Sequence, residues 1–398
     1  MKKTILPLAI IACIFSCRDD GDNFSSTIST ETGETIVNYA TVDSMFAGII
    51  DLNKLANYSN QDLPTYITKD NTLGNSISNE GATLGRVLFY DKELSIDKSL
   101  SCGSCHKQVS GFGDTKLQSD GVNGGLTGRH SMRLINSRFS TERKFFWDER
   151  ANSLEEQTTM PIQDHAEMGF SGQNGNPNLN DLLTRLQEIE YYKELFAFVY
   201  GDSIVSETRI QNSLAQFIRS IQSFDSKFDV GLTQANNLNA NFSNYTAEEN
   251  QGKLLFLSPP NQGGAGCQSC HSAPEFDIDP NTRNNGIIAT IGSTTLDLIN
   301  TRAPSLRDVV GHNGVSNGQL MHDGSLTSLA AVIDHYNLIT PNQANNNLDN
   351  RLRGGGGPGG GQGQSLNLTQ TEKDNLVAFL QTLSGTDVYT NQKWSDPF

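Results

Sequence analysis

Two short stretches of the 398-residue chain place two cysteines and a histidine at the same spacing. They read CGSCH at residues 102–106 and CQSCH at residues 267–271. This spacing is typical of covalent haem c attachment, in which both thiols bond to the porphyrin and the adjacent histidine ligates the iron. We therefore predict two haem c groups. The predicted attachment and ligand residues are Cys102, Cys105, His106, Cys267, Cys270 and His271.

Three other chemistries use paired cysteines. A zinc site needs four converging ligands, and it leaves the histidine after each pair unexplained. Two disulfides would suit an exported chain. A redox dithiol would sit at a helix start after a strand, and no such strand is evident. Haem attachment is favoured over all three because it accounts for the histidine in both copies.

The N-terminus has the features of a targeting segment. Residues 1–16 begin with two lysines and continue as an apolar run that ends just before Cys17. A small residue before a cysteine resembles a lipoprotein signal, so we predict that Cys17 carries a lipid. The mature protein would then be anchored on the periplasmic side of a bacterial envelope, in the outer membrane or at the cell surface. The alternative is an ordinary secretory signal with an incidental cysteine.

The net charge is −15. Binding to nucleic acid requires a basic face, so this charge disfavours nucleic-acid partners. An acidic surface favours a basic partner instead. Small electron-transfer proteins, a cytochrome c or a cupredoxin, are one such class, and we expect a donor of this kind.

The elements that must hold the two motifs form a weak internal repeat. Residues 85–89 read GRVLF and residues 252–256 read GKLLF, and each stretch precedes its CxxCH motif by a similar interval. A duplicated domain explains this pattern better than chance. Apolar residues from Ile210 to Phe224 follow helical spacing. Thr369 and Glu372 form a capping-box pattern that predicts the start of a terminal helix.

These patterns predict a mainly α fold with two cytochrome c-like haem domains in tandem, long loops and little sheet. The glycine-rich residues 353–364 are interpreted as a flexible loop. The predicted divisions are a signal peptide at 1–16, a polar tether at 17–75, an N-terminal domain at 76–245 and a C-terminal domain at 246–390.

Several stretches resemble the bacterial dihaem cytochrome c peroxidase and MauG family. They include the segment LGRVLFYDKELSIDKSLSCGSCH, residues 145–170 (FFWDERANSLEEQTTMPIQDHAEMGF) and residues 320–337 (LMHDGSLTSLAAVIDHYN). The resemblance covers roughly residues 76–386. It implies that hydrogen peroxide binds the first haem opposite His106, and that electrons enter through the second haem.

The resemblance also assigns roles in the segment between the haems. Glu167 matches the glutamate that moves protons as the O–O bond breaks. Trp147 matches a tryptophan that bridges electron transfer, although it could also be a core aromatic residue. Asp148 and Arg150 are expected to form a structural ion pair. His165 is expected to be a solvated loop residue that could assist Glu167.

The far side of the second haem is closed in the family by a methionine or, in MauG-like proteins, by a tyrosine. The matching helix position is Tyr336, with Met321 and His335 as alternatives. A tyrosine oxygen would stabilise ferric iron and lower the reduction potential, whereas a methionine would raise it. His322 matches a histidine close to this haem.

Two departures from the family pattern stand out. The loop before Gly128 has no histidine, so we expect the first haem to be open without prior reduction. His130 replaces an asparagine that helps bind calcium between the domains, so one Ca²⁺ ion remains an open possibility, with Asn317 as a further oxygen ligand. If His130 instead lay over the first iron, that haem would be closed.

Three functions remain. The favoured one is a dihaem peroxidase that reduces hydrogen peroxide to water with electrons from a small redox protein. The second is a MauG-like enzyme that uses peroxide to oxidise a protein or a small molecule. The third is a non-enzymatic electron carrier. Family members often pair, so a homodimer is also expected.

Overall fold

The computed structural model describes residues 28–29, 36–37, 39–354 and 362–398. The chain divides into two units, Met1–Tyr39 and Ala40–Phe398. In the first unit, β1 (Ile28–Ser29) pairs antiparallel with β2 (Ile36–Val37). The predicted signal peptide and the lipid site Cys17 lie outside the described residues. Within the described ranges, no helix is long and apolar enough to cross a membrane.

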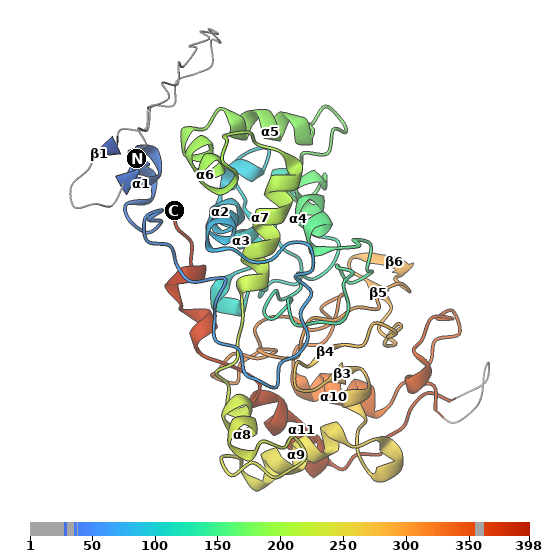
Figure 1. The fold of residues 1–398 in the computed structure, drawn as a ribbon. Coiled ribbons are helices and arrows are strands. Elements are labelled where there is room, and N and C mark those ends of the chain that lie inside the picture. The colour runs from blue at the N-terminus through green and yellow to red at the C-terminus, as the bar shows by residue number, and fades with distance from the viewer. Residues whose placement is uncertain (1–27, 30–35, 38, 355–361) are drawn as a thin grey trace, which may run out of the picture. The chain divides into compact units, whose positions relative to one another are not determined.

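The second unit contains two helical regions, called here the first and second lobes (Figure 1). The first lobe carries the first CxxCH motif at a short helix and surrounds it with six other helices. Its helices are α1 (Ala40–Phe46), α2 (Asn79–Tyr90), α3 (Cys102–Cys105), α4 (Leu154–Gln163), α5 (Leu179–Gln187), α6 (Glu190–Tyr200) and α7 (Glu207–Ser220).

In its described residues, the second lobe has four helices and two small hairpins. Its helices are α8 (Lys227–Ala235), α9 (Ala247–Leu257), α10 (Leu329–Asn337) and α11 (Gln370–Gln381). The strands are β3 (His271–Ser272) with β4 (Asp277–Ile278), and β5 (Ala289–Thr290) with β6 (Ser293–Leu296). The mainly α fold with little sheet is therefore confirmed.

Eight single turns of 3-10 helix complete the described secondary structure of this unit. They are η1 (Lys92–Leu94), η2 (Gln108–Ser110), η3 (Val122–Gly124), η4 (Pro260–Gln262), η5 (Cys267–Ser269), η6 (Asn350–Leu352), η7 (Asp387–Tyr389) and η8 (Gln392–Trp394).

Each lobe is built on one closely packed helix pair. In the first lobe, α2 crosses α7 so closely that a Cβ on Gly85 would overlap the carbonyl of Ser213. In the second lobe, α9 crosses α11, and a Cβ on Gly252 would overlap the carbonyl of Asn375 in the same way. The repeated glycine thus permits helix contact that any side chain would prevent.

The phenylalanine that ends each repeat packs in the same place. Phe89 lies 5.2 Å from Phe217 between ring centroids, and Phe256 lies 5.3 Å from Phe379. All four rings are buried. The sequence repeat therefore corresponds to a structural repeat.

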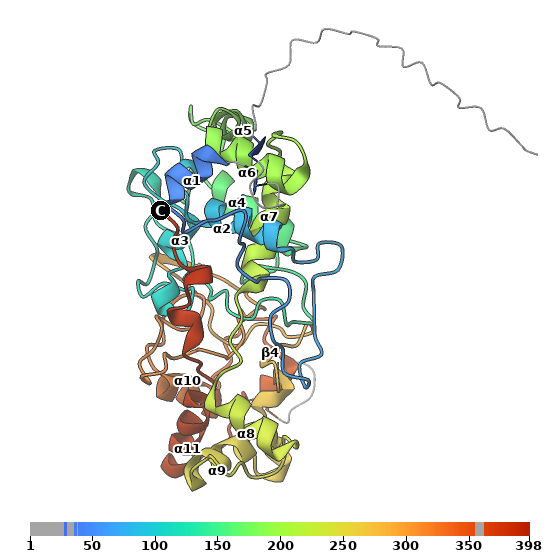
Figure 2. The ribbon, with the colours of Figure 1, turned by 60° about the vertical axis from the view of Figure 1, so that its left-hand side comes forward.

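The main chain passes from the first lobe to the second at residues 221–226. Two other segments also connect the lobes. Before α2, Tyr66 donates a hydrogen bond to Asp229 at 2.8 Å, so residues of the predicted tether contact the second lobe. After α11, the chain returns to the first lobe (Figure 2), where Trp394 donates to Ser220 at 3.2 Å and Tyr90 donates to the carbonyl of Trp394 at 2.7 Å. The predicted domain boundaries stay a prediction.

Local differences from the predicted helices have clear causes. α7 ends at Ser220, so the helix stops before Phe224, which packs instead on Phe139 at 4.9 Å. α8 begins at Lys227 behind a capping box formed by Ser226 and Asp229. Its Phe228 belongs to the second lobe's core. The terminal helix α11 has the expected capping box.

Candidate functional site

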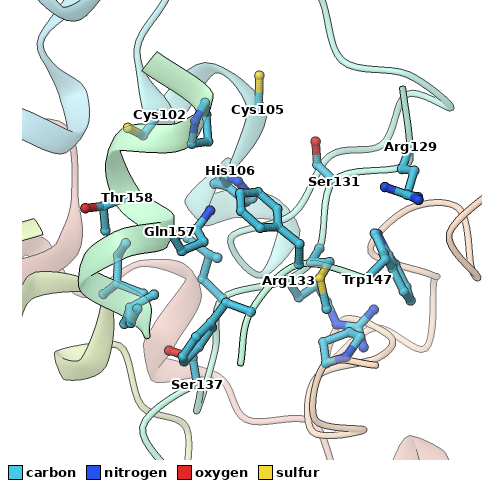
Figure 3. A pocket seen from close by; sticks show the side chains of 18 of the residues that line it. Cys102, Cys105, His106, Arg129, Ser131, Arg133, Ser137, Trp147, Gln157 and Thr158 are labelled. Atoms are coloured by element: carbon cyan, nitrogen blue, oxygen red, sulfur yellow. The ribbon is translucent and has the colours of Figure 1, made fainter. Parts of the chain in front are cut away.

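The first lobe encloses a cavity of about 460 Å³ that is lined by its CxxCH motif. Ser104 accepts a hydrogen bond from the backbone of Ser101 at 3.0 Å, which begins α3 and places Cys102 and Cys105 on one turn. His106 follows directly at the helix end. Figure 3 shows both cysteines and His106 at one end of this cavity, with Trp147 across from them.

The second lobe encloses a cavity of about 440 Å³ that is lined by the other motif. Cys267 lies on the 3-10 turn η5, and Cys270 follows it directly. His271 begins the short strand β3. The two motifs therefore present the same three side chains from slightly different backbone turns.

The residues in both cavities fit covalently attached haem. All four cysteines are free thiols, and burial raises the pKa of Cys102 and of Cys267 to about 12, which disfavours the thiolates that zinc or redox exchange would require. Among the described residues, no group of three or more His, Cys, Asp or Glu side chains could hold a metal ion. Among the described residues, the four cysteines form no disulfide and no set of converging zinc ligands is present.

The two histidines differ in the hydrogen bonding of the ring nitrogen Nδ1. The Nδ1 atom of His106 lies 3.2 Å from the carbonyl oxygen of Phe112, which leaves Nε2 for an iron. The Nδ1 atom of His271 is buried without a hydrogen-bond partner. Burial lowers the pKa of both rings, to about 4 for His271, so both are neutral and able to ligate.

Glu167 lines the first cavity. Burial, with a smaller contribution from Asp164, raises the pKa of its carboxyl to about 7. A carboxyl that titrates near neutral pH can both accept and return a proton. Its placement beside the CxxCH motif is what the proton-transfer role requires, and that role remains a prediction.

The backbone of Glu167 is fixed by the loop that lacks a histidine. Val122 donates to the Glu167 carbonyl at 2.9 Å, and the side chain of Asp164 accepts from the Glu167 amide at 3.1 Å. Cβ atoms on Gly121 or Gly125 would overlap the Ala166 carbonyl, so only glycines allow this loop to pack here. His165 is exposed and lies 2.9 Å from Ser171 Oγ, as expected for a loop residue.

Trp147 lines both cavities. Its indole Nε1 donates to the carbonyl of His130 at 2.7 Å, and its own carbonyl accepts from the amides of Thr301 and Arg302 in the second lobe. Its ring lies 6.3 Å from that of His322. This position between the cavities is compatible with electron transfer through the indole.

The charged groups next to Trp147 form an ion-pair network. Arg150 pairs with Asp148 at 2.8 Å, as the sequence predicted. Arg129 bridges Asp148 at 3.0 Å and Asp297 at 2.8 Å, and so joins the two lobes. These contacts hold the Trp147 segment between the cavities.

The structure distinguishes among the three candidate ligands of the second haem by their positions. Tyr336 and Met321 line the second cavity, whereas His335 does not, because its Nε2 bonds the carbonyl of Asn285 at 3.0 Å. The amide of Asn285 donates to the Tyr336 hydroxyl at 3.2 Å and to the Met321 sulfur at 3.3 Å. Tyr336 and Met321 are thus held at one point of the cavity wall.

His130 and Asn317 are both engaged in the protein. The Nδ1 atom of His130 lies 3.0 Å from the carbonyl of Lys116, and Asn317 donates its amide to the carbonyl of Asp308 at 2.7 Å. His322 lines the second cavity, with Nε2 at 3.0 Å from the carbonyl of Ala289. Calcium binding near these residues stays a prediction.

Sequence reasoning missed three residues of the site: Asn285, Arg133 and Arg302. Single arginine and asparagine residues in loops carry no spacing pattern that would mark them. Only the fold brings Asn285 to Tyr336 and places the two arginines at both cavities.

Comparisons with known proteins agree with this geometry. The family model for di-haem cytochrome c peroxidase matches residues 79–237. The methylamine utilization protein MauG of Methylophilus methylotrophus is 31% identical over 323 residues, which cover 79% of this chain and 85% of that protein. The cytochrome-c peroxidase IdrP1 of Pseudomonas sp. (strain SCT) is 27% identical over 81% of this chain and 84% of that protein.

A solved structure gives the same result. The crystal structure of a MauG-like protein associated with microbial copper homeostasis superposes with a TM-score of 0.66 and 28% identity. The match covers 85% of this chain and 99% of that one. With two CxxCH cavities in a matching fold, the chain belongs to the di-haem cytochrome c peroxidase and MauG family, whose members carry two haem c groups.

Proposed function

We propose that the chain reduces hydrogen peroxide at the first cavity with electrons that enter through the second. The observation that carries this proposal is Glu167, a half-buried carboxyl whose pKa is raised to about 7, in the same cavity as His106. The balanced reaction takes one peroxide, two electrons and two protons to two water molecules.

The residues that would hold the haems are the two cysteine pairs, with His106 and His271 as iron ligands. Bound haem supplies the iron that carries electrons to the peroxide. Glu167 would accept a proton from one peroxide oxygen and deliver it to the other as the O–O bond breaks. A pKa near 7 keeps both proton transfers close to balance at neutral pH.

Electrons from the second cavity pass Trp147, which lies against both cavities. Two electrons are needed for each peroxide, so a donor must be oxidised at the second lobe. The donor in this proposal is a small basic redox protein, which the net charge of −15 favours. Attachment through Cys17 to the periplasmic face of the envelope, and pairing as a homodimer, are parts of the proposal that rest on sequence alone.

A second function is favoured by one specific observation. The hydroxyl of Tyr336 lies in the second cavity, and a tyrosine oxygen would lower the potential of that haem. The second haem would then hold oxidising equivalents and accept electrons from a protein or a small molecule, as in a MauG-like enzyme. Relatives with both names match this chain.

Steady-state peroxide consumption separates the two functions. The purified dihaem protein is mixed with peroxide and a reduced small cytochrome c or cupredoxin. Sustained donor oxidation with two electrons per peroxide supports the peroxidase. Rapid reaction with peroxide but no turnover with such donors favours the MauG-like function. A ferric spectrum with two low-spin haems and no peroxide reaction would support an electron carrier instead.

A further inference from the structure

Buried arginines in the described part of the chain, with one exception, bond a protein group, although Arg307 also leaves its Nε without a partner. Arg307 bonds Asp229 at 2.9 Å, Arg219 pairs with Glu155, and Arg86 donates to the carbonyl of Ser395 at 2.7 Å. The exception is Arg302, which is 8% exposed and whose Nη1 has no hydrogen-bond partner. Arg133, half-buried where it lines both cavities, also has an unpartnered atom, Nε.

Three carboxylates favour the charged form of Arg302 through space, but their hydrogen bonds go to other groups. Glu142 accepts from the amides of Arg143 and Lys144, both at 2.7 Å. Glu149 accepts from Thr301 at 2.7 Å. The third, Asp277, pairs with Lys69 and accepts from the amide of Thr141 at 3.1 Å. Arg302 itself lies over the ring of Phe145, at 4.6 Å from the centroid.

Arg133, on the first-lobe side of the interface, also has no hydrogen bond to a carboxylate that the structure describes. Its Nη2 donates to the carbonyl of Ser305 at 3.1 Å, which links the lobes but supplies no negative charge. The nearest acid, Asp308, accepts instead from the amide of Gly385 at 2.9 Å and from Tyr389 at 3.1 Å.

Neither guanidinium is hydrogen-bonded to a carboxylate of the described residues, and nearby acids act on both only through space. Burial lowers the pKa of Arg133 and of Arg302 to about 10, so both remain protonated at neutral pH. A buried donor without a hydrogen-bond partner is destabilising, and a planar guanidinium is suited to a carboxylate. Both arginines line both cavities, one from each lobe, and the group that those cavities fit is a porphyrin bearing two carboxylates.

We propose that Arg133 and Arg302 form one carboxylate-binding pair at the lobe interface, and that this pair receives propionates from both haems. The proposal rests on the two-haem part of the proposed function and adds a binding role for two residues. The pair would raise both reduction potentials, because positive charge favours the reduced haem. Loss of either arginine should therefore affect both haems, although each belongs to a different lobe.

The test measures the midpoint potentials of both haems in the dihaem protein by spectroelectrochemistry. Arg133→Leu and Arg302→Leu should each lower both potentials, with a change of roughly tenfold in the reduced-to-oxidised ratio at a fixed applied potential. The potentials should also become pH-dependent where an unpaired carboxylate takes up a proton. Arg302→Lys should give a smaller shift in potential, because lysine keeps the positive charge but cannot form the bidentate hydrogen bonds of a guanidinium.

The matched control is Arg138→Leu, which removes the same charge from an arginine that pairs with Asp70 at 2.6 Å and lines neither cavity. Its potentials should equal those of the parent protein. If the leucine variants do not fold, Arg133→Gln and Arg302→Gln replace them. Unchanged potentials in both variants, or a shift confined to one haem, would overturn the shared pair.

Two further measurements distinguish propionate binding from an absence of haem and from binding of a solvent anion. Mass spectrometry first counts attached haems, and a chain without them refutes the proposed function as well as the pair. The parent protein is then titrated in chloride and in phosphate at equal ionic strength. If a solvent anion fills the site, the potentials will depend on the anion, which overturns the propionate assignment. Independence from the anion supports it.

Discussion

In the first lobe Gly85 of α2 lies against the carbonyl of Ser213, and in the second lobe Gly252 of α9 lies against Asn375. These helix pairs are built in the same way, and each lies beside a CxxCH motif. The other walls of the two cavities differ. Glu167 lines the first, and Tyr336 and Met321 line the second. The comparison teaches that the duplicated part carries the haem-attachment motifs, while the diverged walls carry the residues for which we propose different roles.

The largest expected effect comes from removing one haem at a time. Cys102→Ala with Cys105→Ala should leave one haem and abolish the reaction with peroxide. Cys267→Ala with Cys270→Ala should also leave one haem, but the first lobe should still react with peroxide while turnover with a donor is lost. Mass spectrometry counts the haems, and stopped-flow absorbance follows the peroxide reaction. Full turnover in the second variant would refute the division of labour.

Glu167→Gln should slow peroxide consumption by about 10²- to 10⁴-fold, because it removes the proton acceptor. Burial raises the Glu167 pKa from 4.5 to about 7, and the ionised form is the acceptor. The rate in the parent protein should therefore fall as pH drops through about 7, and the variant should lack this inflection.

The control is Glu188→Gln, an exposed glutamate of the same lobe, which should keep the parent rate and pH profile. Haem spectra of the Glu167 variant should match the parent. An unchanged rate in that variant would remove Glu167 from the mechanism.

Gly85→Ala and Gly252→Ala should each destabilise the protein by about 2 kcal/mol or more, since a methyl group would overlap a backbone carbonyl in both. Denaturant unfolding of the dihaem protein measures this effect. Gly128→Ala is the control, because a Cβ there meets no atom within 4 Å. A large loss in one lobe only would show that the two helix pairs are not equivalent.

Tyr336→Phe is expected to have the smallest effect on turnover. Its main effect should be on the electron paramagnetic resonance spectrum. It should change the low-spin signal of the second haem in electron paramagnetic resonance and leave the high-spin signal of the first unchanged. Met321→Leu is the matched variant, since Asn285 holds both side chains. A change in Met321→Leu alone would transfer the ligand assignment to Met321.

Much of this arrangement was predictable because it rests on local patterns. The CxxCH motifs, the GRVLF and GKLLF repeat and the capping box at Thr369 depend on short spacing, and each appears as expected in the fold. The end of α7 was not predicted, because Ile221 and Phe224 continue the apolar spacing beyond Ser220.

The contacts of Asn285, Arg133 and Arg302 were also beyond sequence reasoning. They join residues far apart in the chain, such as Asn285 with Tyr336 and Arg133 with Ser305. Isolated polar residues show their role only when burial and missing partners are known.

The return of the last residues to the first lobe has a consequence for how the protein is made. Trp394 and Ser395 complete contacts with Ser220 and Arg86, which are synthesised long before them. The first lobe therefore lacks part of its own core until residues 394 and 395 have been synthesised. Cys102 and Cys105 belong to this lobe, so their surroundings are completed only when these late residues have been added.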